Sequence, residues 1–189
     1  RELTVRALHE CAACARMSGD LVHARHHVDN ALRLSEGLSG PTRAATLYEC
    51  GATLLDSGDL KGAERAIRRA IELFPDAERR IRTTALLGYI LAQTGSVKEA
   101  RRMLLAILPE AEASGSRLRL ADLHNALGEI ARSAHNLEVA EQHYRIALAT
   151  LDGTGIVDPA YRANLALVLF ERGEVKDARQ LLASVMREA

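Results

Sequence analysis

The fold of this chain is decided by residues 47–75, which read LYECGATLLDSGDLKGAERAIRRAIELFP. The first part of this stretch repeats small or apolar residues at the i, i+3, i+4, i+7 spacing of one helix face. These residues are Leu47, Cys50, Gly51 and Leu54. A turn follows in which Gly58 can adopt the left-handed conformation and Asp59 can cap the next helix. Pro75 ends the second apolar stripe, so the stretch predicts two helices joined by a tight turn.

The same pattern recurs along the whole chain. Each copy has an alanine five residues after the turn, and successive alanines are 39, 37, 40 and 38 residues apart. These residues are Ala24, Ala63, Ala100, Ala140 and Ala178. Periods of this size are typical of stacked repeats that bury their apolar faces against one another, and no segment alternates like a strand. We therefore expect one all-α solenoid over residues 1–189, with about five repeats at residues 4–37, 42–75, 80–113, 118–152 and 158–188.

The second repeat resembles the tetratricopeptide repeat, whose pattern is W-x2-L-G-x2-Y, then A-x3-F, then a proline. Its matching positions are Leu47, Gly51, Leu54, Ala63, Ile67 and Pro75. The third and fourth repeats supply Leu87-Gly88 and Leu127-Gly128 at the equivalent positions. The resemblance implies a right-handed α-solenoid whose small residues let helices approach and whose large residues fill the gaps. Because every period exceeds 34 residues, the helices or loops should be longer than usual, as in the repeats of bacterial sensor ATPases, transcription activators and kinases, and of kinesin light chains.

The resemblance also implies that inward residues of each first helix line a concave groove. These residues are Arg6, His9, Arg16, Met17, Tyr48, Leu55, Asp56, Arg82, Tyr89, Gln93, Asp122, Asn125, Glu129, Arg132, Leu167, Phe170 and Glu171. The set contains three of the six aromatic residues of the chain, beside several arginines. This composition is typical of binding hot spots, so we expect a protein or peptide partner. An ordinary solvated surface is the alternative.

The charges along this groove suggest a ligand with two unlike ends. Arginines come from the first three repeats, whereas Asp122, Glu129 and Glu171 come from the last two. An extended peptide or a helix with acidic and basic ends would be complementary. The groove contains no lysine, so it does not reproduce the lysine–asparagine clamp with which some members of the family bind chaperone tails.

Two cysteines and two histidines near the start have a spacing similar to that of zinc sites, Cys11-x2-Cys14-x8-His23-x3-His27. However, Cys11 occupies the position of a core leucine in the family, and a buried free cysteine packs as a small apolar residue. We expect core cysteines, no metal and no cofactor.

Other classes of function find little support in the sequence. There is no phosphate-binding glycine loop, no Gly-x-Ser-x-Gly and no His-Glu-x-x-His, so we do not expect an enzyme. Seven arginines cluster on the second helices and could contact nucleic acid, but acidic residues are interspersed among them. The arginines are Arg65, Arg68, Arg69, Arg79, Arg80, Arg101 and Arg102. With a net charge of zero, a salt-bridged convex surface is the preferred interpretation.

Composition and the chain ends suggest a cytoplasmic fragment. Three cysteines are typical of free thiols in a reducing compartment, and no apolar run reaches the roughly 20 residues that a membrane-spanning helix needs. The last helix keeps an apolar stripe at Leu181, Leu182, Val185 and Met186. We expect either that further helices follow or that two chains pair end to end. The chain would then be a scaffold or sensor segment of a larger, bacterial regulatory protein.

Overall fold

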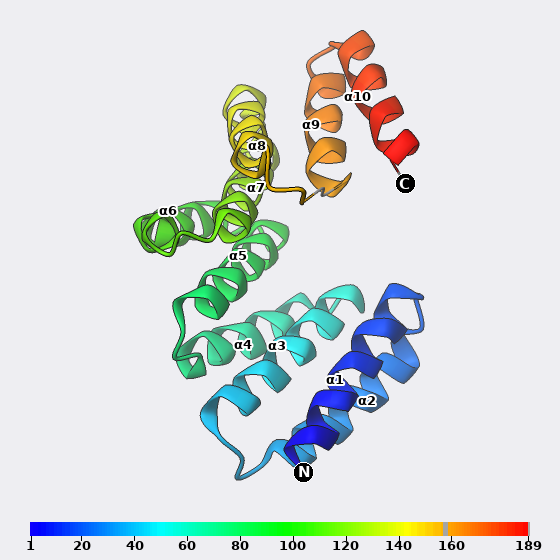
Figure 1. Ribbon diagram of the computed structural model, residues 1–189, viewed down its shortest axis with the longest axis vertical. Coiled ribbons are helices and arrows are strands. Elements are labelled where there is room, and N and C mark those ends of the chain that lie inside the picture. Colours follow the sequence, from blue (N-terminus) through cyan, green and yellow to red (C-terminus); the bar gives the residue numbers. More distant parts are fainter. Residues whose placement is uncertain (157–158, 189) are drawn as a thin grey trace.

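The computed structural model describes residues 1–156 and 159–188, and these residues form ten helices and no strand (Figure 1). The helices are α1 (Glu2–Met17), α2 (Leu21–Ser35), α3 (Gly40–Asp56), α4 (Leu60–Leu73), α5 (Ala77–Gln93), α6 (Val97–Ala113), α7 (Arg117–Ser133), α8 (Leu137–Leu151), α9 (Pro159–Glu171) and α10 (Val175–Glu188). The all-α solenoid predicted from the repeats is confirmed. Most of the length beyond 34 residues lies in the helices, because α3, α5, α6 and α7 each have 17 residues.

Successive helices pair as hairpins that stack in chain order, from the N-terminal pair at the bottom of Figure 1 to the C-terminal pair at the top. The odd-numbered helices form an inner row, in which α1 packs on α3, α5 on α7, and α7 on α9. Helix α6 lies on the outer side of the curve (Figure 1). The backbones of α3 and α5 approach each other less closely than those of any of these pairs, and α7 and α9 approach only slightly more. We call this widest junction, between α3 and α5, the break in the inner row.

Side chains at the tight turns of the first, second and fourth hairpins cap the second helix, namely those of Asp20, Asp59 and Asn136. In the second repeat Gly58 has φ of +80°, and the Asp59 side chain accepts a hydrogen bond from the Gly62 amide at 2.8 Å, as predicted. In the third repeat Ser96 and Glu99 have the spacing of a capping box, but the Ser96 side chain makes no cap hydrogen bond. Glu99 instead accepts a hydrogen bond from Arg68 of the preceding repeat at 2.8 Å.

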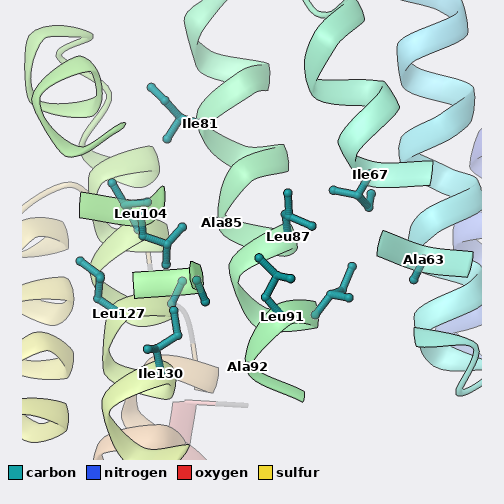
Figure 2. Close-up of a cluster of buried hydrophobic side chains, with 14 of the residues drawn as sticks. Ala63, Ile67, Ile81, Ala85, Leu87, Leu91, Ala92, Leu104, Leu127 and Ile130 are labelled. Carbon is teal, nitrogen blue, oxygen red and sulfur yellow. The ribbon is translucent and has the colours of Figure 1, made fainter. Parts of the chain in front are cut away.

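Each hairpin is closed by a small residue that faces a larger one 16 positions later. A Cβ atom on Gly51 would lie 2.5 Å from Cδ1 of Ile67, and one on Gly128 would lie 2.6 Å from the Tyr144 ring. Gly88 stands in the same relation to Leu104. All five repeat alanines are also buried, at 2% exposure or less. Figure 2 shows Ile67, Leu87, Leu104 and Leu127 between adjacent helices, where these close approaches make a continuous core.

The two terminal repeats vary this pairing. In the first repeat the small residue is Ala12, and its partner is the shorter Val28; both are buried. In the fifth repeat Ala166 is buried, but Leu182 of α10 remains 44% exposed, whereas Ile67, Leu104 and Tyr144 are fully buried. Met186 is 82% exposed. Val185, which the sequence placed on the same stripe, lies outside the described side chains.

The first repeat supplies a test of the small–large pairing. Gly51→Ala should lower the free energy of unfolding by about 1–3 kcal/mol, because the new methyl group overlaps Ile67. Ile67→Val alone should cost about 1 kcal/mol. The double variant recreates the Ala12–Val28 combination and should lose clearly less than the sum of the two changes, as measured by urea titration. Additive losses would show that the two positions are not a packed pair.

Two histidines face each other inside the fourth repeat. Nδ1 of His124 on α7 and Nδ1 of His143 on α8 are 3.2 Å apart, and His124 is buried. Burial lowers the pKa of both imidazoles, and the pKa of His143 is lowered further by His124 and by Arg101 of α6. Because one hydrogen bond between two Nδ1 atoms needs a neutral ring as acceptor, the pair resists full protonation.

This pair predicts how stability depends on pH. The unfolded histidines titrate near 6.5, above their folded pKa, so the unfolded chain binds more protons as the pH falls through that value. The free energy of unfolding should therefore be lower at pH 5.5 than at pH 7.5, and His124→Gln should reduce this difference. The exposed His26→Gln variant is the control. If both variants keep the pH dependence of the native chain, the buried pair is not its source.

Candidate binding groove

The inner faces of α3, α5, α7 and α9 enclose a hollow of about 710 Å³, which we call the central hollow. Its lining residues are Tyr48, Arg82, Ala85, Leu86, Tyr89, Leu118, Arg119, Asp122, Asn125, Ala126, Glu129, Arg132 and Asn164. Seven of them are among the predicted groove residues, namely Tyr48, Arg82, Tyr89, Asp122, Asn125, Glu129 and Arg132. The central hollow therefore brings together seven of the seventeen inward positions inferred from the repeat pattern.

A second hollow of about 540 Å³, the N-terminal hollow, lies between α1, α3 and α5 and includes the predicted Arg6 and His9. Tyr48 and Arg82 line both hollows, so the two adjoin at the break between α3 and α5. The Arg82 guanidinium carbon stands 4.8 Å from the centroid of the Tyr48 ring. This cation–π contact spans the break where the two helices themselves do not pack closely.

Side-chain hydrogen bonds join α7 to α9 in the C-terminal half of the inner row, and we call these two joined faces the zipped wall. The Tyr161 hydroxyl donates to Asp122, Asn164 donates to Asn125 at 3.0 Å, and Arg132 donates to Glu171 at 3.1 Å. Each bond joins α7 to α9 across 39 residues, so equivalent positions of neighbouring repeats pair in register. The polar groups of this wall therefore bond to one another.

The most buried acid of the groove belongs to the same wall. Glu129 is 9% exposed, and its carboxylate accepts hydrogen bonds from Arg132 at 2.7 Å and from the Tyr144 hydroxyl at 3.0 Å. Burial, and then the neighbouring carboxylate, raise the pKa of Tyr144, whereas hydrogen bonding to Glu129 raises that of Arg132. Glu129 therefore fixes α7 to α8 and is not a free ligand for a partner.

These pairs correct the expected separation of charge along the groove. Each acid expected to make one end negative has an arginine partner, since Asp122 pairs with Arg119 and Arg132 is shared by Glu129 and Glu171. On the basic side, Arg16 pairs with Asp56 at 3.7 Å. The polarity seen in the sequence is largely cancelled within the fold.

Helix α5 presents the open face of the groove. Arg82, Ala85, Leu86 and Tyr89 line the central hollow at the i, i+3, i+4, i+7 spacing of one helix face. Arg82 is exposed and Tyr89 is 36% exposed. This strip combines one cation with apolar and aromatic surface.

Several predicted groove residues do not line either hollow. These are Arg16, Met17, Leu55, Asp56, Gln93, Leu167, Phe170 and Glu171. Most lie in the last turn of their helices, at the rim next to the hairpin turns. Met17 is 87% and Phe170 58% exposed, whereas Leu55 packs against the core.

Sequence reasoning missed two polar residues of the central hollow. Arg119 holds both Asp122 and Glu78, and Asn164 bonds Asn125. A signal for each was present, because Arg119 precedes Asp122 by three residues on one helix, and Asn164 is the counterpart of Asn125 in the next repeat.

The cysteines near the start are not core residues, so that prediction is wrong. Cys11 and Cys14 are both exposed, because Ala12 takes the buried position opposite Val28. Within residues 1–156 and 159–188, no group of three or more His, Cys, Asp or Glu side chains is placed to hold a metal ion.

The outer arginines are partly engaged by acids, as expected for a salt-bridged convex surface. Arg68 donates to Glu64 at 3.0 Å and to Glu99 at 2.8 Å, and Arg80 pairs with Glu110. In the described part of the chain, no helix is both long and apolar enough to cross a lipid bilayer.

The zipped wall predicts a contrast between two arginines of the groove. Arg132→Met leaves the buried Glu129 without its main partner, and the free energy of unfolding should fall by about 2–3 kcal/mol. Arg82→Met removes only an exposed cation–π contact and should cost less than about 1 kcal/mol. Thermal or urea unfolding of the two variants measures the difference. Equal losses would contradict the assignment of Arg132 to the scaffold and Arg82 to the free surface.

Comparison with known proteins agrees with this geometry. Residues 159–184 match the family model of the tetratricopeptide repeat. No curated protein sequence matches the chain. Solved structures with the same fold include tetratricopeptide-like repeats of a kinesin light chain from Podosopora anserina, with 16% identity, a TM-score of 0.70, and coverage of 99% of this chain and 95% of that one.

Two other solved structures are similar. Rap protein complexed with Competence and Sporulation Factor has 14% identity and a TM-score of 0.86; the match covers 98% of this chain and 54% of that one, so this chain spans about half of Rap. PilF from Pseudomonas aeruginosa has 19% identity, a TM-score of 0.68, and coverage of 98% and 78%. At these identities the likeness concerns the fold. The chain has an α-solenoid fold similar to that of these proteins, and its residues 159–184 match the tetratricopeptide repeat.

Proposed function

We propose that this chain binds a segment of a partner protein in its concave groove, with the inner faces of α3 and α5 as the contact surface. The observation that carries the proposal is the contrast between the two halves of the groove. Polar groups of α7 and α9 bond to one another, whereas Tyr48, Arg82 and Tyr89 face a hollow of about 710 Å³ with much of their hydrogen-bonding capacity unused. Aromatic and arginine side chains contribute more binding energy than most residues at interfaces.

The shape of the hollow favours an extended segment over a globular surface. The central and N-terminal hollows adjoin, and together they are lined by five inner helices, from α1 to α9. An extended chain of several residues can follow such a channel and place alternate side chains into it. In the similar Rap structure the protein is complexed with Competence and Sporulation Factor, which supports a role in ligand binding for this type of fold.

We place this binding activity in a larger regulatory protein, for which the solenoid serves as scaffold or sensor. The match to Rap supports this, because the chain corresponds to about half of that protein. Solenoid repeats contact only their neighbours, so additional repeats or domains can be joined without disturbing the groove.

Selection from a random 12-residue peptide library displayed on phage tests the groove directly. The native chain should enrich certain peptides. A Tyr48→Ser, Tyr89→Ser variant should not bind them, because the two substitutions remove both aromatic rings from the groove. The matched control is Leu105→Ser, which removes an exposed apolar residue from α6 on the outer side. Circular dichroism confirms that each variant is folded.

Enrichment that is retained by Leu105→Ser and lost by the groove variant is the expected result. Peptides that bind all three proteins equally well would place recognition elsewhere on the molecule. A native chain that enriches no peptide at all would argue against the proposed function.

A further inference from the structure

Arg82 differs from the other arginines of the central hollow in its electrostatic surroundings. Arg119 is held by Asp122 and Glu78, and Arg132 by Glu129 and Glu171. Arg82 forms no ion pair with any described residue, although its side chain is exposed on the wall of the hollow. It also lines a smaller hollow together with Asp76 and Glu78, but neither acid lies within ion-pair distance of it. Arg82 is therefore a cation of the groove without a direct ion pair among the described residues.

The position of Arg82 is nevertheless fixed. Its guanidinium lies over the Tyr48 ring at 4.8 Å, and this contact uses one flat face of the group. The N–H donors of a guanidinium lie in its plane and point away from a stacked ring, so they stay available to an incoming acceptor. Stacking restricts the side chain before a ligand arrives, which lowers the entropic cost of binding.

One acid close enough to attract Arg82, Glu49, is poorly suited to pair with it. Glu49 lines the N-terminal hollow beside Tyr48, and burial raises the pKa of its carboxyl although Arg16 and Arg82 act in the opposite direction. One of its oxygens, Oε2, is buried without a hydrogen-bond partner. A carboxylate delivered by a ligand from the open side of the groove would meet Arg82 without that burial.

Apolar surface adjoins the charge on the same helix face. Leu86 and Tyr89 follow Arg82 by one and two turns of α5, and Leu118 and Ala126 of α7 lie on the opposite wall of the hollow. A peptide that places an acid on Arg82 would therefore set neighbouring side chains against carbon-rich surface.

We infer that Arg82 binds a carboxylate of the partner segment, so that the groove selects an acidic peptide with apolar residues next to the acid. This inference rests on the proposed function, since it names the ligand class of the same groove. The chemistry is that of a charge-assisted, bidentate hydrogen bond between guanidinium and carboxylate. In the α7–α9 wall, by contrast, Arg132 is already bound by Glu129 and Glu171, so we assign that wall to support of the groove.

Two peptide pools of otherwise identical composition distinguish the possible outcomes. One random 12-residue pool contains Asp and Glu, and the other replaces them with Asn and Gln. Both are panned at 150 mM salt against the native chain, Arg82→Gln and Arg69→Gln. Arg69 is an exposed arginine of α4 outside both hollows, so its substitution removes the same charge and controls for nonspecific attraction.

The native chain and the Arg69→Gln variant should each enrich acidic peptides at least about tenfold more than the Arg82→Gln variant does. This is the effect expected from the loss of one charge-assisted hydrogen bond. The acid-free pool should give no such enrichment. If the acid-free pool is enriched as strongly, or if Arg82→Gln retains the acidic peptides, the groove binds peptides but Arg82 is not the carboxylate site. If neither pool is enriched by the folded native chain, both the inference and the proposed function fail.

Discussion

The structure depends on one packing constraint, the close approach of a small residue to a larger one 16 positions later. Gly51, Gly88 and Gly128 leave room for Ile67, Leu104 and the Tyr144 ring, and a single methyl group on any of these glycines would collide with its partner. Because protein interiors are packed as densely as organic crystals, such contacts set the separation and rotation of the two helices in a hairpin. The rotation in turn decides which residues of the first helix face inward. The groove is therefore a consequence of how each repeat closes.

The inner row of helices has two parts, which differ in how neighbouring helices are joined. From α7 to α9, neighbouring repeats bond through Tyr161, Asn164 and Arg132 in register, and the buried Glu129 ties this wall to α8. Between α3 and α5 the helices do not pack closely, and Arg82 bridges the break by lying on Tyr48. Polar groups that satisfy each other stabilise the scaffold, whereas groups that do not can bind something else. We interpret the first part as structural support and the second as the binding surface.

The fold could be predicted from sequence because the same helix–turn–helix pattern recurs in five repeats. Ala63 and its four counterparts, the Gly51–Ile67 spacing and the capping Asp59 are local signals, and each acts within one hairpin. The prediction that Cys11 is a core residue relied on a single position and was wrong. Cys11 lies one residue from the buried Ala12, and a shift of one residue rotates a side chain by about 100° around a helix, which takes it out of the core.

The candidate site could be predicted only in outline. Inward positions such as Tyr48, Arg82 and Tyr89 followed from the family pattern, but their chemical state did not. Whether an arginine is free depends on residues about 40 positions away, as for Arg119 with Glu78 and Arg132 with Glu171. Such partners meet only when successive repeats stack, so these pairings between repeats could be seen only in three dimensions, whereas Arg119–Asp122 and Arg132–Glu129 lie three residues apart on one helix.

A crystal structure of the native chain with a selected peptide bound would test the account most directly. The account predicts that the peptide crosses the break between α3 and α5, in contact with Tyr48 and Tyr89, while the α7–α9 hydrogen bonds stay unchanged. A peptide bound to the outer face of α6, or one that separates α7 from α9 to bind, would contradict it.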